Sequence, residues 1–360
     1  MHRPLIIVGI LMLQMFLLNN LNAQEVEKKI KDRSIIALPV IFYLPETRLG
    51  FGGVGRFSFR WQEQEVDKIS SVDVGAVYTL NKQLLLNLPY NLYFKEDTFW
   101  FKGEFGYFDY FYPFRGFGHE NRVALESYTV NFPRIESDLL YKVKGECYIG
   151  VGFRIDSRSD QEFEEGGLLM TQDIQGKQGG VTAGLGPVLI FDRRDHINFP
   201  SKGSLIQLKY FQASELFASD YNFSFFEYGL SKYFPKGKNV LALNTYGKAV
   251  FGDIPFYEYA RYGGGKQARG YLLGSFRDKN AIGFQAEYRM VFKKRFGAAI
   301  FVNVGTVFDD FNAVNLENAL PAIGTGLRYT LSEEQRLNMR VDVGLGKEGL
   351  QFYFTFGEAF

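Results

Sequence analysis

The side chains that most often carry out catalytic or metal chemistry are scarce in this chain. It has 3 histidines and 1 cysteine in 360 residues, and His119 and His196 lie far apart in the sequence. A nucleophilic serine needs a histidine within hydrogen-bond reach, and a structural zinc site needs about four Cys or His ligands. The strand pattern described below assigns the two histidines to connections at opposite ends of the molecule. We therefore predict no catalytic residue, no metal site and no cofactor, and we do not expect an enzyme.

Two glycine-rich segments match nucleotide-binding loops only in part. Residues 50–55, Gly-Phe-Gly-Gly-Val-Gly, fit the G-x-G-x-x-G spacing, but that fingerprint needs a helix after it. The residues that follow, 56–61, alternate as a strand does. Residues 263–266, Gly-Gly-Gly-Lys, lack the spacing of a phosphate loop and the Ser or Thr after Lys. Because 41 Lys and Arg balance 40 Asp and Glu, the charge predicts no nucleic-acid partner either.

The elements that position the remaining polar residues are strands. In residues 282–292 the even positions are apolar, whereas several odd positions carry Gln, Glu or Arg, and residues 147–156 and 336–345 alternate in the same way. The runs are about 10 to 14 residues long, which suits tilted membrane strands better than the shorter strands of a soluble sandwich. Aromatic residues make up 17% of the chain and end many runs, as in the girdles of membrane barrels. We predict an all-β fold, a transmembrane antiparallel β-barrel.

Counting the runs predicts sixteen strands. They are 35–44, 48–61, 69–80, 83–95, 98–110, 127–142, 145–157, 181–193, 203–214, 221–234, 239–252, 281–293, 296–308, 321–331, 335–346 and 350–360. The long connections all follow odd-numbered strands, which predicts that they lie together outside the cell, opposite short periplasmic turns. These connections are 111–126, 158–180, 253–280 and 309–320. Within 127–142, Pro133 predicts an interruption of the ladder.

The beginning of the chain predicts export. Residues 1–23 contain an apolar run that is too short to span a bilayer, and they end in a small residue, Ala23, as a cleaved signal peptide does. Residues 24–34 are then a short periplasmic lead, and residues 35–360 form one barrel domain. This division leaves no room for a separate periplasmic domain. We expect the protein in the outer membrane of a Gram-negative bacterium, after signal-peptide export.

A short motif in the longest connection carries a resemblance to a known family. Arg269-Gly270-Tyr271 lies between the eleventh and twelfth predicted strands. Other matching segments follow the order of the chain: Asp-Arg-Arg-Asp and Phe-Pro-Ser-Lys-Gly within 192–203, Gly-Thr-Gly-Leu-Arg at 324–328, and the aromatic ending at 352–360. Together they resemble the BamA/TamA family of outer-membrane assembly proteins, the bacterial surface antigen superfamily, whose signature in that loop is Arg-Gly-Phe/Tyr. The resemblance covers the barrel only, without the family's periplasmic polypeptide-transport-associated domains.

The resemblance implies that the 253–280 loop folds back into the lumen, where Arg269 meets acidic groups on the twelfth and thirteenth strands. Glu287 and Arg289 are expected there as lumen partners, since the alternation of their own strand points them inward. Asn303 stands where the family pattern, Phe-x-Asp-x-Gly, has an acidic residue. Because Asn303 brings no charge, we expect a weaker contact than in the family. Arg269 is expected either to anchor the loop alone or to take part in a working cycle.

The seam between the first and last strands is the second candidate site. Pro39 cannot donate to a ladder and Gly357 lies near the end of the last strand, so we expect few hydrogen bonds between these strands. The resemblance implies a seam that opens sideways and lets a client strand pair with the exposed edge. Phe360 resembles the terminal signal by which assembly machinery recognises barrels, which would make this chain a client of that machinery through its C-terminal strand.

These expectations give one preferred function and two alternatives. The preferred function is insertion or translocation of proteins, or of lipid, by a BamA/TamA-type barrel whose partners are outer-membrane lipid and outer-membrane protein clients. The alternatives are a solute channel gated by the 253–280 loop and a structural subunit of an envelope complex. Inward residues of both signs predict no clear ion selectivity. They include Lys102, Glu104, Arg154, Asp156, Lys209, Lys248, Arg328 and Asp342.

Overall fold

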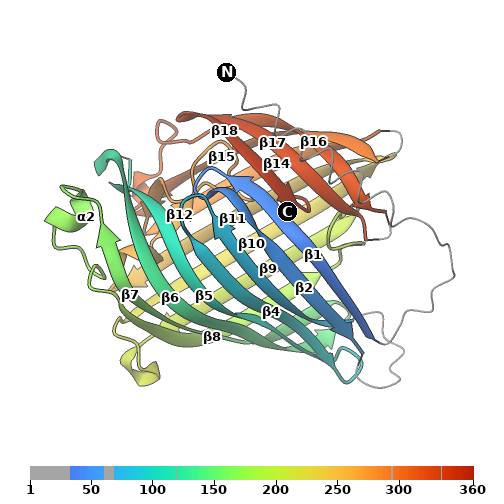
Figure 1. Cartoon of the computed structure of the whole chain (residues 1–360), viewed down its shortest axis with the longest axis horizontal. Helices are drawn as coiled ribbons and strands as arrows, with labels where there is room; N and C mark the ends of the chain where they lie inside the picture. Colours follow the sequence, from blue (N-terminus) through green and yellow to red (C-terminus); the bar gives the residue numbers. More distant parts are fainter. Residues whose placement is uncertain (1–32, 61–68, 120, 293–294, 334) are drawn as a thin grey trace.

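The computed structural model describes residues 33–60, 69–119, 121–292, 295–333 and 335–360, so the predicted export signal and most of the predicted lead lie outside the described residues. Sixteen antiparallel strands close into one barrel, which confirms the predicted fold class (Figure 1). The wall strands are β1 (Arg33–Leu44), β2 (Arg48–Phe59), β3 (Ser70–Thr79), β4 (Leu84–Phe94), β5 (Phe99–Phe117), β6 (Asn121–Lys144), β7 (Cys147–Phe163), β8 (Gly180–Asp192), β9 (Gly203–Ala213), β10 (Phe223–Lys236), β11 (Asn239–Gly252), β14 (Asn280–Val291), β15 (Phe296–Phe308), β16 (Ala322–Ser332), β17 (Leu337–Gly346) and β18 (Gly349–Phe356). Consecutive wall strands are neighbours, and β1 meets β18 to close the wall.

The buried core lies inside the barrel lumen. On β14, Gln285, Glu287 and Arg289 are 1% exposed or less, whereas the alternating Ile282 and Phe284 are 36% and 43% exposed on the outer surface. Because successive side chains of a strand point to opposite faces, polar residues fill the lumen and apolar residues cover the lipid-facing wall. The period of two in the sequence therefore sets the inside and the outside of the barrel.

The hairpin of β5 and β6 is longer than the sequence pattern predicts. The two strands stay paired as far as Phe117 opposite Asn121, so the predicted long connection at 111–126 is wrong. Aromatic contacts support this extension, since the stacked rings of Tyr112 and Tyr128 have centroids 5.5 Å apart. The strand ends were predicted from the run of regular alternation. The paired aromatic residues continue the ladder beyond that run.

Pro133 lies inside β6 without ending the strand. It stands in register with Tyr107 of β5, whereas the register of β6 with β7 has no pair between Asn131 and Arg134. Proline has no N–H to donate, so it is tolerated where one edge of the strand leaves the ladder open. The predicted interruption is therefore limited to one edge of β6.

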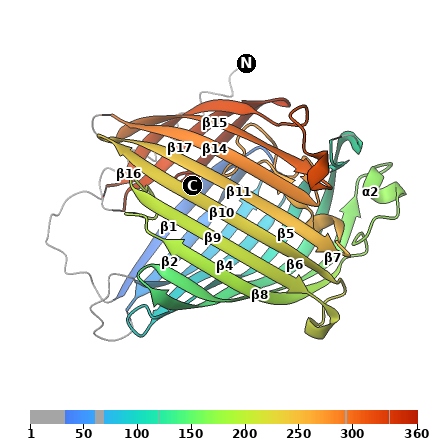
Figure 2. The same cartoon turned by 180° about the vertical axis from the view of Figure 1, so that it is seen from behind.

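The two ends of the barrel differ, as the predicted loop lengths indicate. One end carries the longer connections with their short helical segments, α2 (Leu168–Thr171), η2 (Glu215–Phe217) and η4 (Phe311–Ala313). The connection that contains η3 (Phe256–Glu258) starts from the same end, but the residues of η3 are buried. Figure 1 shows α2 at this end, and Figure 2 shows the same arrangement from behind. Turns of two residues, such as 145–146 and 237–238, lie at the other end. Within the ranges that the structure describes, no helix has the length and apolar character to cross a membrane.

Candidate functional site

The connection between β11 and β14, residues 253–279, lies inside the lumen, as the resemblance implies. It contains η3 and two short paired strands, β12 (Ala260–Tyr262) and β13 (Phe276–Asp278). In Figure 1, β12 lies within the outline of the barrel. One apolar cluster joins loop residues with inward residues of the wall: Ile254, Ala260, Tyr262, Ala268, Tyr271 and Phe276 from the loop, and Phe211, Phe223, Phe225, Tyr246 and Val307 from the wall. The loop is therefore packed as part of the core.

Arg269 is the centre of the contact between the loop and the wall. Its side chain is 0% exposed, and its guanidinium lies 2.6 Å from Glu287 of β14 and 2.7 Å from Asp342 of β17. The guanidinium carbon is also 3.6 Å from the centroid of the Phe301 ring. Charge-assisted pairs shielded from water are strong enough to hold a loop in one place. The second carboxylate comes from β17, the fifteenth strand of the wall, and not from the thirteenth as expected.

Gly270 and Tyr271 fit into a tight gap beside β17. Gly270 has a φ of +113°, a conformation that favours glycine, and its N–H donates to the Tyr353 hydroxyl at 3.0 Å. A Cβ atom on Gly344 would lie 2.7 Å from the Gly270 nitrogen, so the close approach requires glycine there too. The Tyr271 hydroxyl donates to the Pro321 carbonyl at 2.6 Å. The Arg-Gly-Tyr motif is thus a rigidly held contact between loop and wall.

The other two expected lumen partners contact different groups. Asn303 of β15 donates from Nδ2 to the main-chain oxygen of Arg269 at 3.1 Å, so it fixes the backbone of the loop. Arg289 pairs with Glu287 at 2.7 Å and donates to the main-chain oxygen of Phe360 at 2.7 Å. The structure therefore brings Arg269, Glu287 and Asn303 together, whereas Arg289 connects Glu287 to the residues that follow β18.

A second buried charge of the loop contacts another part of the wall. Glu258 of η3 is 3% exposed, and its carboxylate lies 2.9 Å from Arg154 of β7 and 3.6 Å from Lys248 of β11. Lys248 also donates to the main-chain oxygen of Glu258 at 3.1 Å. Burial opposes ionisation of Glu258, but Arg154 and Lys248 hold the pKa of its carboxyl below the usual range. The loop therefore has one positive and one negative anchor, Arg269 and Glu258.

Arg328 and Arg340 extend the network around Arg269, and the sequence did not predict their contacts. Arg328 lies 2.5 Å from Asp342 and 2.9 Å from Glu358, and Arg340 lies 2.7 Å from Asp342. Alternation correctly predicts Arg328 and Asp342 as inward residues. It does not give the height of a residue along the barrel axis, which depends on the register between strands. From the sequence, the proximity of Arg328 and Arg340 to Arg269 could have been predicted only by combining this alternation with an assumed register between the strands.

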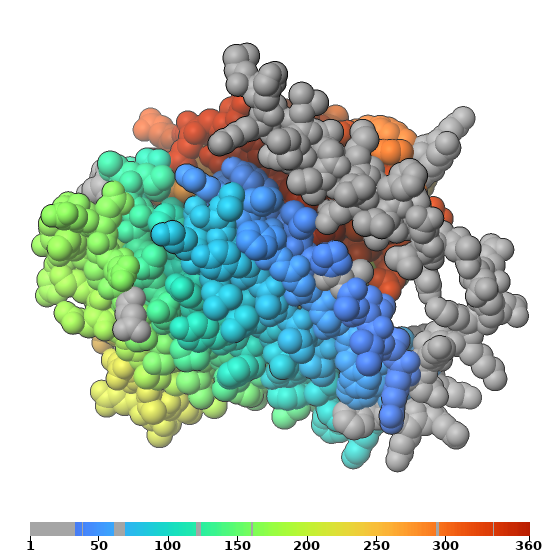
Figure 3. Space-filling view, in the orientation of Figure 1, coloured from blue at the N-terminus to red at the C-terminus, as the bar shows by residue number. Residues whose placement is uncertain are grey.

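The seam between β1 and β18 has little strand pairing. The two strands pair at one position, Tyr43 opposite Phe354, whereas every residue of β1 pairs with β2. Pro39 stands in the middle of β1, opposite Gly53 of β2. In Figure 3 the blue surface of the first strands adjoins the red surface of the last strands. A single paired position makes this junction a weak point in an otherwise continuous ladder.

Residues 357–360 do not continue the wall, so the predicted strand 350–360 is too long. β18 ends at Phe356, and Gly357 has a φ of +75°, which non-glycine residues rarely adopt. The chain then turns into the lumen, where Phe360 packs against Tyr233. The C-terminus falls inside the barrel outline in both Figure 1 and Figure 2. The prediction failed here because the apolar residues continue to Phe360 while the chain direction changes at Gly357.

Glu46 is a buried carboxyl close to the seam. It lies in the 45–47 turn between β1 and β2 and is 5% exposed, and its Oε2 atom has no hydrogen-bond partner among the described residues. Burial raises the pKa of Glu46 to about 7, although its own backbone N–H and Arg261 of the loop act in the opposite direction. Two tyrosines, Tyr110 and Tyr353, also face this carboxyl. Ionisation of Glu46 places a poorly solvated charge next to the seam strand.

The barrel is expected to lose stability as the pH rises, because of Glu46. The folded chain keeps a proton on Glu46 up to about pH 7, whereas the unfolded chain releases it near 4.5. The loss across this window is expected to be about 3 kcal/mol, and Glu46→Gln should remove it. Urea unfolding in detergent at pH 5 and pH 8 measures the effect. Glu96→Gln, in an exposed turn, is the control, and an unchanged pH dependence in Glu46→Gln would contradict the assignment.

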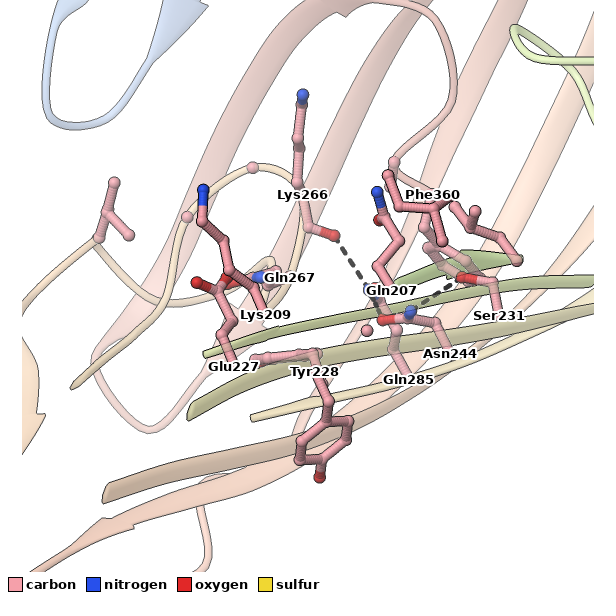
Figure 4. Close-up of a pocket in the computed structure, with 18 of the residues that line it drawn as sticks. Gln207, Lys209, Glu227, Tyr228, Ser231, Asn244, Lys266, Gln267, Gln285 and Phe360 are labelled. Atoms are coloured by element: carbon pink, nitrogen blue, oxygen red, sulfur yellow. Dashed lines mark hydrogen bonds between the residues drawn. The ribbon is translucent and has the colours of Figure 1, made fainter. Parts of the chain in front are cut away.

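A cavity of about 720 Å³ opens in the lumen beside the loop (Figure 4). Its lining combines wall side chains with Lys266 of the loop and with Phe360. Gln285 donates to the main-chain oxygen of Lys266 and to Oδ1 of Asn244, both at 3.0 Å, so wall amides hold the loop beside the cavity. The volume falls in the range of roughly 300–1,000 Å³ that is usual for ligand sites. Across the described part of the chain, no group of three or more His, Cys, Asp or Glu could hold a metal ion.

Comparison with known proteins agrees with this architecture. The profile of the Omp85 superfamily domain matches residues 68–360. No curated protein sequence matches the chain. A structure of BamA from Haemophilus ducreyi lacking POTRA domains 1–3 is similar, with a TM-score of 0.60 and 16% identity over 90% of this chain and 70% of that one.

Two further solved structures have a similar fold. CdiB from Escherichia coli has a TM-score of 0.61 and 12% identity, over 90% of this chain and 62% of that one. CdiB from Acinetobacter baumannii has a TM-score of 0.57 and 12% identity, over 91% of this chain and 60% of that one. The chain thus spans about three fifths of the length of the CdiB chains. At these identities the likeness concerns the fold.

Proposed function

The chain belongs to the Omp85 superfamily, and on that premise we propose that it takes part in inserting or translocating proteins, or lipid, at the outer membrane. Barrels of this superfamily are assembly or transport proteins, not enzymes, and they work with partner machinery and membrane lipid. Their fold implies the outer membrane of Gram-negative bacteria. The proposal for this chain concerns the route, which is the seam between β1 and β18.

The observation that carries the proposal is the single paired position of the seam. Tyr43 opposite Phe354 is the only rung between the described residues of β1 and β18, although β1 has 12 residues and β18 has 8. Few hydrogen bonds must break to separate these strands. An exposed strand edge is a template for pairing with another chain, so a client strand could add to the edge of β1. Pro39 contributes no N–H to that edge.

Locking the seam with a disulfide is expected to abolish the activity. Residues directly opposite in antiparallel strands have Cα atoms about 4.5–5.5 Å apart, which a disulfide can bridge. Tyr43→Cys with Phe354→Cys, in a chain whose only cysteine is changed by Cys147→Ser, is placed in liposomes with an unfolded client barrel. The unlocked chain should accelerate client folding over empty liposomes. Oxidation should reduce the rate to that of empty liposomes, and reduction should restore it.

A disulfide elsewhere in the wall is the control. Ala286→Cys with Val302→Cys joins opposite residues of β14 and β15, and it is expected to leave the acceleration intact. If the locked seam accelerates folding as well as the unlocked one, the seam is not the route. If the unaltered chain gives no acceleration over empty liposomes, the insertion function itself fails.

The proposed partners follow from the outer surface and from β18. The apolar wall, including Phe352 and Phe356 at 52% and 39% exposure, suits contact with outer-membrane lipid. Recognition of this chain as a client by assembly machinery would use β18 before the barrel closes, because Phe360 lies in the lumen of the closed barrel. Among the described residues no observation favours the solute-channel or structural-subunit alternative over insertion.

A further inference from the structure

Glu358 occupies a cradle that belongs to the wall. Its side chain is 1% exposed, and its carboxylate accepts hydrogen bonds from Arg328 Nε at 2.9 Å and from Asn338 Nδ2 at 2.8 Å. Arg289 Nε lies 3.8 Å from the same carboxylate. Arg289, Arg328 and Asn338 are 1%, 4% and 6% exposed. Three buried polar side chains from β14, β16 and β17 thus converge on one carboxylate.

An aromatic slot lies beside this cradle. The ring of Phe360 packs with Phe199 and with Tyr233, whose ring centroid is 6.4 Å from that of Phe360. Val240 contributes to the same apolar cluster. Arg289 spans both parts of the site, since its guanidinium lies 5.2 Å from the Phe360 ring centroid and donates to the Phe360 main-chain oxygen. The site therefore fits a carboxylate side chain followed, two positions later, by an aromatic one.

The charge balance of the network around Glu358 favours an anionic occupant. One connected network contains four arginines and three carboxylates: Arg269, Arg289, Arg328, Arg340, Glu287, Asp342 and Glu358. Removal of Glu358 would leave four positive and two negative groups in a buried region. An uncompensated buried charge is strongly unfavourable, so the vacated cradle would favour another carboxylate in its place.

The last two residues of the tail border the open part of the lumen. Ala359 and Phe360 line the cavity of about 720 Å³, which also borders Gln207 and Lys209 (Figure 4). Gly357 joins the tail to β18, and apart from its chain neighbours no atom of the described residues lies within 4 Å of the place where a Cβ on Gly357 would stand. A glycine at this joint lets residues 358–360 turn away from β18 without a steric clash at the joint itself.

We propose that the cradle and the slot form a binding site for an extended peptide segment in trans, which residues 358–360 occupy in cis. The ligand class is a segment with a carboxylate side chain two positions before an aromatic residue. Because Glu358 and Phe360 occupy the site, they compete with any segment that binds in trans. Only segments of this pattern can then displace them. The inference goes beyond the proposed function, because such binding does not require the seam to open.

Binding of a labelled heptapeptide amide tests this proposal. Its sequence is that of residues 354–360, Phe-Thr-Phe-Gly-Glu-Ala-Phe, and its fluorescence anisotropy is measured with the full chain folded in detergent. The unaltered chain is expected to bind it roughly tenfold more weakly than a chain carrying Glu358→Ala and Phe360→Ala, because its own tail competes. Adding Arg328→Gln to the latter should weaken binding roughly tenfold, since a charge-assisted bond is lost.

Two controls make the result decisive. A heat-modifiable gel shift shows that each variant is folded, and Glu358→Gln, which keeps the shape of the tail, provides a second variant that should also bind more tightly than the unaltered chain. A peptide with Gln in place of Glu should bind roughly tenfold more weakly than the original peptide. Equal affinities for the two peptides, or for the unaltered and altered chains, would overturn the proposal. Client folding in liposomes is measured separately, so the two proposals fail independently.

Discussion

Arg269→Ala is expected to destabilise the barrel by about 3 kcal/mol and to release the loop from the lumen wall. The change removes the cation between Glu287 and Asp342, both of which are fully buried. Removing one partner of a buried ion pair costs about 3–5 kcal/mol, and the lower figure applies because each carboxylate keeps another arginine. Urea unfolding in detergent measures the loss of stability. Trypsin cleavage after Lys266 measures the release of the loop.

An exposed ion pair at the end of the same loop provides the control. Lys279 lies 2.6 Å from Asp309, but the two side chains are 45% and 63% exposed. Lys279→Ala should therefore change stability by less than about 1 kcal/mol. If Arg269→Ala lost as little stability as Lys279→Ala, and if the loop stayed protected from trypsin, then Arg269 would not be the residue that holds the loop.

Glu258→Ala is expected to have a comparable effect at the other anchor, about 3 kcal/mol. It would leave the side chains of Arg154 and Lys248 facing each other without the carboxylate that separates them. Arg154 keeps Asp156 at 3.3 Å, which limits the damage. Urea unfolding again reports the change, and new cleavage after Arg261 reports the local release of the loop.

Combining the two substitutions tests whether the anchors hold one unit. The double variant Arg269→Ala with Glu258→Ala should lose less stability than the sum of the single losses, because a loop freed at one anchor is already partly free at the other. Strict additivity would mean that the anchors hold separate segments. Glu164→Ala, which removes an exposed carboxylate from the β7–β8 connection, should stay within about 0.5 kcal/mol of the unaltered chain.

The inward and outward faces of each wall strand can be predicted, because the alternation within one strand is enough to tell which of its side chains point inward. The alternation in residues 282–292 is enough to place Glu287 inside and Phe284 outside, without knowledge of any neighbour. The lengths of the runs then separate membrane strands from the shorter strands of a sandwich. The resemblance in Arg269-Gly270-Tyr271 adds the expectation that the loop enters the lumen, and with the parity of β14 it leads to the Arg269–Glu287 contact.

The remaining contacts depend on how the strands and connections lie relative to one another. The sequence pattern of a single strand does not predict this. Asp342 points inward by its own alternation, but its approach to Arg269 depends on the registers of three successive strand pairs, from β14 to β17. Glu258 belongs to a connection without periodicity, so no pattern predicts its partners. At Gly357 one change of φ redirects the chain while the residues continue to resemble a strand.

The two anchors of the loop have their partners on opposite sides of the loop in the sequence. Arg154 and Lys248, which receive Glu258, precede the loop in the chain, whereas Glu287 and Asp342, which receive Arg269, follow it. Glu258 can therefore dock while the last five wall strands are still absent. Arg269 gains its second carboxylate only when the fifteenth strand has joined. Docking at both anchors therefore needs fifteen of the sixteen wall strands, so only β18 and the seam lie beyond the residues that the loop contacts through Arg269 and Glu258.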